Sequence, residues 1–225
     1  MGNTIDIIKS FSEEEIESVS ISCSAVDLTV TMSHDGLAHI ECKNVRFGSS
    51  AEVNGGVLCV NVKEPELLDK LFGDLLSPSA CRISLPDKLY RSFTTDLGVG
   101  NGKIGPLQCT SATVTVGAGN IHISGLSAEN TASLKVGAGN MTLDKSVCGM
   151  LEVGAGTGNV DIVCDTNGLN IQGGVGNISF DGRADGDVFV KGGIGNVRIR
   201  LHDRHEGEYK LRTEHGLGKL DVEYV

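Results

Sequence analysis

The feature that most constrains this chain is a glycine–asparagine motif that recurs at a nearly constant step. The stretches VGAGN, GAGTGN, GGVGN and GGIGN belong to one series, with steps of 19, 20, 19, 18, 19 and 23 residues. Such a period is typical of a repeat array, in which each turn buries its apolar face against its neighbours. The series consists of Asn101, Asn120, Asn140, Asn159, Asn177 and Asn196, and Lys219 closes it.

Apolar and polar residues alternate on both sides of each motif, which predicts half-buried strands. We expect the residues six and two before each asparagine, and one and three after it, to face inward. Around Asn140 these are Leu134, Ala138, Met141 and Leu143. The alternation slips by one residue at the Gly-Asn pair, so the chain must bend there. Glycine reaches positive φ freely and asparagine tolerates the left-handed region next best, which suits both to a corner.

A turn of about 19 residues is too short for a strand–helix–strand unit and suits two or three short strands per coil. We therefore predict an all-β, single-domain parallel β-solenoid over residues 19–225. The stretch ISCSAVDLTV fits its frame with Asp27 at the asparagine position. If the corners stack, the six asparagines form a structural ladder, each hydrogen-bonded to the corners above and below.

Two segments depart from the repeat. Residues 65–76 carry leucines and a phenylalanine at helical spacing after Pro65, which predicts one short inserted helix. Residues 1–18 include Ser12 and Glu15 at the spacing of a capping box, and we expect them to form an N-terminal cap over the first coil.

Charge and cysteine content limit the partners and the compartment. The formal net charge is −10, which argues against nucleic-acid binding because an acidic chain repels phosphate backbones. Apolar runs fall short of the eighteen residues needed to span a bilayer, so we predict no transmembrane segment. Seven cysteines and no basic, apolar leader predict reduced thiols and a cytoplasmic location, with an envelope-associated protein as the alternative.

The serial VGAGN, GAGTGN, GGVGN and GGIGN turns resemble those of the bacterial putative-adhesin domains of unknown function that form parallel β-helices. The stretch ISLPDKLYRSFTTDLGVGNGKI is also similar to the segment that leads into the first regular turn of that family. The resemblance covers residues 19–225. It implies a surface or envelope role and provides no catalytic residue that could be assigned here.

The motifs give no catalytic, cofactor-binding or metal-binding assignment. The sequence GVGNGKI lacks the Ser or Thr that follows the lysine of a phosphate-binding loop, and strands rather than a helix follow each glycine motif. The aspartates Asp181, Asp185 and Asp187 do not match a calcium-binding loop. The histidines His202, His205 and His215 lack the order of a zinc motif, so we interpret them as residues of a polar loop.

These observations favour a non-enzymatic binding or scaffold protein. It would present flat solenoid faces to a protein or a glycan, or associate with itself. The alternative is a carbohydrate-active β-helix lyase or hydrolase. Glycosidases need two carboxyl groups at a defined separation, and the outward columns of the repeat mix both signs of charge without supplying such a pair.

Overall fold

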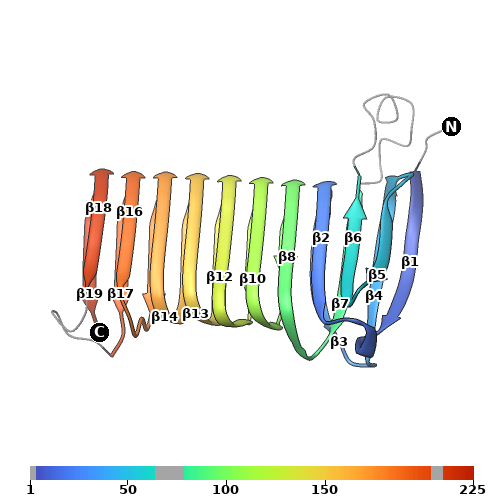
Figure 1. Cartoon of the computed structure of the whole chain (residues 1–225). Coiled ribbons are helices and arrows are strands. Elements are labelled where there is room, and N and C mark those ends of the chain that lie inside the picture. The colour runs from blue at the N-terminus through green and yellow to red at the C-terminus, as the bar shows by residue number, and fades with distance from the viewer. Residues whose placement is uncertain (1–3, 64–78, 204–209) are drawn as a thin grey trace.

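The computed structural model is a rod of stacked strands with the two termini at opposite ends (Figure 1). The structure describes residues 4–63, 79–203 and 210–225. Strands dominate, and within these ranges the helical structure is one 3-10 turn, η1 (Glu13–Glu15). The prediction of an all-β parallel solenoid is confirmed.

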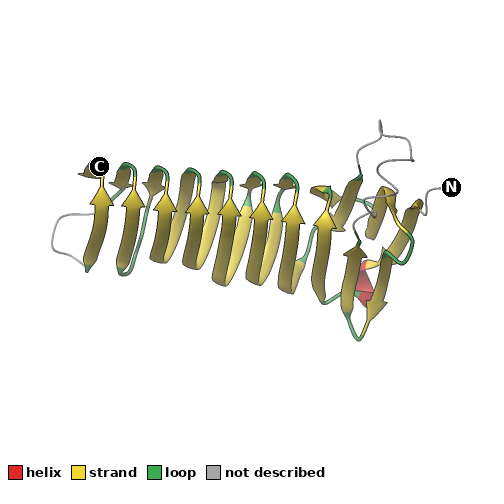
Figure 2. Cartoon of the chain, turned by 90° about the horizontal axis from the view of Figure 1, so that it is seen from above, coloured by secondary structure: helices red, strands yellow, loops and turns green. Residues whose placement is uncertain are grey.

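Each regular turn passes through two layers that a short loop connects (Figure 2), either as two strands or as one long strand. The strands in the first part are β1 (Thr4–Ser12), β2 (Ser18–Ala25), β3 (Asp27–Ser33), β4 (Leu37–Arg46), β5 (Ser50–Asn54), β6 (Val57–Val62), β7 (Ala80–Pro86), β8 (Leu89–Val99) and β9 (Gly102–Ile104). Those in the second part are β10 (Leu107–Ala118), β11 (Ile121–Ser124), β12 (Leu126–Ala138), β13 (Met141–Thr157), β14 (Val160–Val175), β15 (Ile178–Gly182), β16 (Val188–Ile194), β17 (Val197–Leu201), β18 (Leu211–Leu217) and β19 (Leu220–Tyr224).

The ladder of parallel pairs keeps equivalent residues of successive turns beside one another. One layer pairs in the order β6–β2–β8–β10–β12–β13–β14–β16–β18. The other pairs as β7–β3–β9–β11–β13–β14–β15–β17–β19. The long strands β13 and β14 belong to both layers. Because parallel neighbours lie about 4.8 Å apart, side chains at one repeat position form columns along the rod.

The N-terminal end departs from the regular order of the turns. The first coil, β2–β3, lies between β6–β7 and β8–β9, so it is an internal turn. Residues 4–12 form β1, which pairs antiparallel with β4, and β4 in turn pairs antiparallel with β7. The capping box of Ser12 and Glu15 is present, and it begins η1. The helix predicted for residues 65–76 lies outside the described residues.

Aliphatic side chains fill the interior, and three aromatic side chains, Tyr90, Phe93 and Phe180, are also fully buried. Cys42 and Cys81 face each other across β4 and β7, with their Cα atoms 4.1 Å apart, and form a disulfide. The expectation of seven reduced thiols is therefore wrong for this pair. The five free cysteines are Cys23, Cys59, Cys109, Cys148 and Cys164.

Candidate functional site

The corners stack into a continuous hydrogen-bonded column. Asn140 Oδ1 accepts from the backbone N–H of Asn159 at 3.0 Å and from its Nδ2 at 3.3 Å. Asn140 Nδ2 in turn donates to Asn120 Oδ1 at 3.0 Å. The column begins at Asp27, whose Oδ1 accepts from Asn101, and ends where Lys219 N–H donates to Asn196 Oδ1 at 3.0 Å. The side chains thus satisfy corner N–H groups that no strand partner reaches.

Glycine alone provides the unusual backbone conformation at these corners. The glycine before each asparagine has φ between +135° and +141°, whereas the positive-φ residues other than glycine in the described chain are Asn44, Lys145 and Asp203. A Cβ on Gly139 would collide with the carbonyl oxygen of Gly119 in the turn below. Asparagine is therefore suited to this position by its hydrogen bonds, and the expected left-handed conformation is wrong for it.

A column of side chains, all apolar except Thr157, lies on the outside of the rod beside this ladder. We call it the apolar column, and it consists of Val99, Ala118, Ala138, Thr157, Val175, Ile194 and Leu217. These residues stand two before each corner residue and were expected to face inward. Instead Val99 is 56% exposed, Ile194 53% and Leu217 70%.

The bend begins two residues before the Gly-Asn pair at which the alternation placed it. The residue three before each corner is glycine, as at Gly117 and Gly137, and a Cβ on Gly137 would meet the carbonyl oxygen of Gly117. The chain can pack this closely on the previous turn only without a side chain. The bend at this glycine turns the next residue outward, which produces the apolar column.

The same glycines form the floor of a shallow groove that follows the rod axis, which we call the glycine groove. Its floor consists of Gly117, Gly137, Gly156, Gly174 and Gly193, and its volume is about 620 Å³. Thr115, Lys135, Gln172 and Lys191 line it on the side away from the corners. A second depression of about 340 Å³ adjoins it around Ser133, Glu152 and Asn170. Together with the apolar column, the groove offers a contact surface several turns long.

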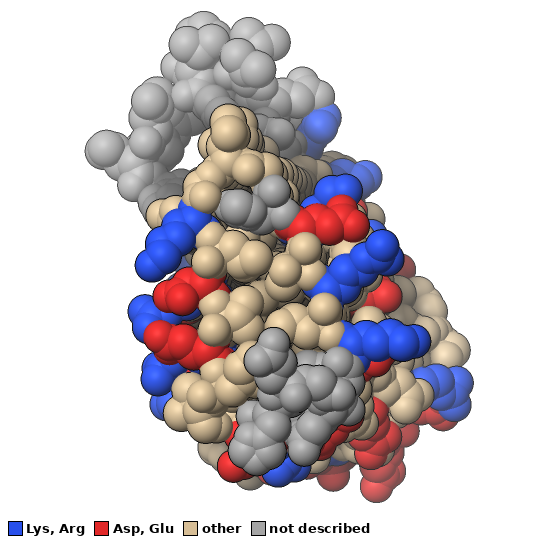
Figure 3. Space-filling model, turned by 90° about the vertical axis from the view of Figure 1, so that its left-hand side faces the viewer, with Lys and Arg blue, Asp and Glu red and all other residues tan. Residues whose placement is uncertain are grey.

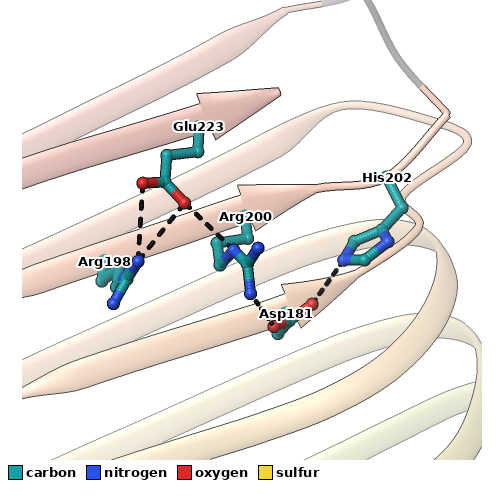
Figure 4. Close-up of polar contacts among 5 residues, drawn as sticks. All are labelled: Asp181, Arg198, Arg200, His202 and Glu223. Atoms are coloured by element: carbon teal, nitrogen blue, oxygen red, sulfur yellow. Dashed lines mark hydrogen bonds and ion pairs between the residues drawn. The ribbon is translucent and has the colours of Figure 1, made fainter. Parts of the chain in front are cut away.

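The opposite layer carries a network of charges near the C-terminal end (Figure 4). Asp181 on β15 accepts from Arg200 Nη1 at 3.1 Å and contacts His202 Nε2 at 2.5 Å. Arg200 Nε lies 3.0 Å from Glu223 Oε2, and Arg198 Nη2 lies 3.3 Å from the same oxygen. Asp181 on one turn and Glu223 on the turn after next both contact Arg200 on the turn between them. The network therefore links three successive turns.

The charged side chains of this end lie along its two flanks, as an end-on view shows (Figure 3). Between them the visible part of the last described turn presents uncharged residues. At the C-terminal end, the outer surfaces of the two layers are therefore charged, whereas the surface between them is uncharged. The flanks have mixed charge, as the sequence predicted for the outward columns.

The aspartates and histidines considered as metal ligands do not come together as a site. Asp181 contacts Arg200 and His202, and Asp185 lies near Arg183 at 3.4 Å. Within residues 4–63, 79–203 and 210–225, no group of three His, Cys, Asp or Glu side chains could hold a metal ion. His205 lies outside the described residues. No helix of the described chain is long and apolar enough to cross a membrane.

Comparison with known proteins gives a family match over almost the whole chain. Residues 16–224 match the family model described as Toastrack DUF4097. No curated protein matches the sequence.

Several solved structures are similar in fold. A "putative adhesin" from Bacteroides fragilis has a TM-score of 0.62 at 14% identity, with 97% of each chain covered. A "putative lipid binding protein" from Parabacteroides distasonis has a TM-score of 0.48 at 13% identity, over 100% of this chain and 98% of that one. A "putative cell adhesion protein" from Clostridium sporogenes has a TM-score of 0.42 at 14% identity, over 99% and 100%. The first of these likenesses shows a shared fold.

Proposed function

The chain belongs to the Toastrack DUF4097 family, and from that premise we propose that it is a non-enzymatic binding protein. It presents the glycine groove and the apolar column to a protein or glycan partner. The name of the Bacteroides fragilis neighbour, a "putative adhesin", supports an activity of this class. The family resemblance inferred from the repeated turns is confirmed by the match over residues 16–224.

The observation that carries the proposal is the set of exposed aliphatic side chains along the apolar column, three of which, Val175, Ile194 and Leu217, lie on successive turns. Scattered apolar residues are normal on a protein surface, but a contiguous apolar strip indicates an interaction site. Val99, Val175, Ile194 and Leu217 are each about half exposed or more. Complete burial of such a side chain contributes roughly 1.5–3 kcal/mol, so covering the exposed half of all four gives about 4 kcal/mol.

That gross energy corresponds to roughly millimolar binding before the entropic cost of association. Specific binding therefore requires polar contacts as well. Lys135, Gln172 and Lys191 line the adjacent groove and supply hydrogen-bond donors there. A partner that lies along the rod can contact the apolar column and these polar side chains at the same time.

The experiment is site-specific photo-crosslinking with the full chain in its native host. Benzoylphenylalanine replaces Ile194 in the apolar column, and the matched control replaces Asp161, which is exposed on the opposite layer. We expect a discrete adduct from position 194 that is absent from position 161, and mass spectrometry identifies it as protein or glycan. Equal adducts at both positions, or none at either, would refute this face as the binding surface.

Three further measurements complete the test. The substitution Ile194→Glu should abolish the adduct formed from a benzoylphenylalanine placed at Val175, because the charge would have to be desolvated at the contact. Fractionating the cross-linked cells tests the cytoplasmic location predicted from the sequence. Release of new reducing ends from a panel of polysaccharides by the purified chain would instead support the carbohydrate-active enzyme.

A further inference from the structure

The depression of about 340 Å³ beside the glycine groove lies over a gap in the outer surface of the rod at Gly154. Its neighbours along β13, Val153 and Ala155, are buried, so position 154 faces outward. The strand register places it in one outward column with Lys135 on the turn before and Gln172 on the turn after. Both neighbours have long side chains, and glycine leaves the space between them open.

The backbone does not require glycine at position 154. Gly154 is not among the residues with positive φ. A Cβ added there would meet Lys135 Cγ at 3.5 Å, which is an ordinary contact, whereas a Cβ on Gly156 would collide with the carbonyl oxygen of Gly137. A glycine inside a strand weakens the strand and often marks a place where a ligand approaches closely. The open space at Gly154 is therefore a feature of the surface that folding alone does not explain.

Polar side chains of three successive turns surround this gap. Ser133, Glu152 and Asn170 form the neighbouring outward column, and Lys135 and Gln172 flank the gap itself. Together they supply a hydroxyl, a carboxylate, an ammonium group and two amides, which donate and accept hydrogen bonds. Among the described residues, Lys135 and Glu152 have no ion-pair partner. Their hydrogen-bonding groups are thus available to a ligand.

An aromatic side chain continues the neighbouring column on the next turn. Phe189 pairs in register with Asn170 and is partly exposed. Val188 and Val190 on either side of it are buried, so its ring points outward. The face of an aromatic ring carries partial negative charge and attracts the weakly positive hydrogens of C–H groups. A ligand with polar edges and a C–H face can therefore contact the amides and this ring together.

We propose that the depression over Gly154 is a subsite for one neutral hexopyranose residue of a glycan chain. The inference rests on the proposed function and commits its partner to a glycan. A hexopyranose has hydroxyl groups around its edge, each of which donates and accepts, and C–H groups on its faces. The opposite charges of Lys135 and Glu152 balance, so the subsite favours a neutral sugar over an anionic one.

The glycine groove provides a path for the rest of the glycan chain. The depression and the groove share Lys135, Gly154 and Gln172, so they form one continuous surface. The strands of Lys135 and Gln172 are two strand spacings, or about 9.6 Å, apart. One sugar ring fits over Gly154 between them, and its neighbours in the chain lie over the glycine floor along the rod axis.

The test is isothermal titration calorimetry of the purified full chain. The probes are neutral hexasaccharides of glucose, galactose and mannose, with hexagalacturonate as the acidic comparison. We expect at least one neutral hexasaccharide to bind, and to bind more tightly than hexagalacturonate. Binding to none of the three neutral probes, or tighter binding to hexagalacturonate, would refute the subsite.

Variants locate the bound sugar. Gly154→Gln fills the gap and should weaken binding by about tenfold or more, because the ring loses its place and its hydrogen bonds. The matched control is Thr142→Gln, outward on the other layer of the same strand, and it should leave Kd unchanged. Asn170→Ala and Phe189→Ala leave the gap open and should each weaken binding by several-fold, with circular dichroism to confirm folding. Equal Kd values for the Gly154, Asn170 and Phe189 variants and the control would place the sugar elsewhere.

The failure of this inference is distinct from the failure of the proposed function. Photo-crosslinking from Ile194 tests the binding surface whatever the partner is. A protein adduct from position 194, with no hexasaccharide bound, would refute the glycan subsite and leave the binding surface supported. Hexasaccharide binding that Gly154→Gln weakens, with no adduct from position 194, would support the subsite and refute the role of the apolar column.

Discussion

The substitution Asn140→Ala tests the role of the asparagine ladder in the middle of the rod. It removes two bonds that Asn140 accepts from Asn159 and one that it donates to Asn120. A net contribution of about 0.5–1 kcal/mol for each exposed bond gives a loss of about 2 kcal/mol in the free energy of unfolding. For a chain of this length that loss lowers Tm by roughly 4–8 °C.

Thermal and urea denaturation followed by circular dichroism measure this loss, with Thr142→Ala on the same strand as the control. Hydrogen exchange provides a local measurement, because the Asn159 amide loses its acceptor and should exchange faster. A Tm for Asn140→Ala equal to that of the control, with unchanged protection of the Asn159 amide, would refute the ladder as a source of stability.

Two related variants separate the hydrogen bonds from the backbone conformation. Asn140→Asp keeps the acceptor for Asn159 and loses the donor to Asn120, so it should cost about 1 kcal/mol. Asp27 already fills this role in the first coil. Gly139→Ala should be more damaging than either, because its Cβ would collide with the turn below at a positive φ. We expect Gly139→Ala to lower the free energy of unfolding most, Asn140→Ala less, and Asn140→Asp least.

Two other predictions follow from the charges and thiols. Asp181→Asn should lower the free energy of unfolding by about 1 kcal/mol, because it weakens the contacts to Arg200 and His202, and the loss should be smaller in high salt. Denaturation at two salt concentrations checks this, and a loss that does not depend on salt would contradict it. Burial raises the pKa of Cys23 and of Cys109 from 9.0 to about 12. The unfolded thiols therefore lose their protons first, and the free energy of unfolding should fall as pH rises from 9 towards 12. Replacing both cysteines with alanine should reduce this fall, as urea titrations across that range would show.

Much of the fold follows from patterns that are local in the sequence. The inward positions one and three after each corner, such as Met141 and Leu143, are buried as predicted. Asp27 occupies the first corner position, as the frame of ISCSAVDLTV suggested. These predictions succeed because strand alternation and corner chemistry depend on a few adjacent residues.

The exposure of the apolar column was not predictable from alternation alone. Ile194 and Leu217 are apolar at a position with the parity of the core, yet both face solvent. Their orientation depends on a glycine one residue earlier that packs on the carbonyl oxygen of the previous turn, as Gly193 does on Gly174. The sequence did contain an indication of this, because each corner is preceded by two glycines, such as Gly193 and Gly195, and one glycine is enough to form the corner.

The sequence by itself determined the period, the parallel β-solenoid and the residues at its corners, because each turn repeats the same local chemistry. Only the tertiary structure decided that β2–β3 lies between β6–β7 and β8–β9, that Cys42 bonds Cys81, and that Cys148 meets Cys164. Those contacts join residues of different turns. Their partners depend on the order and register in which the turns stack, and no stretch of sequence shorter than a turn contains that information.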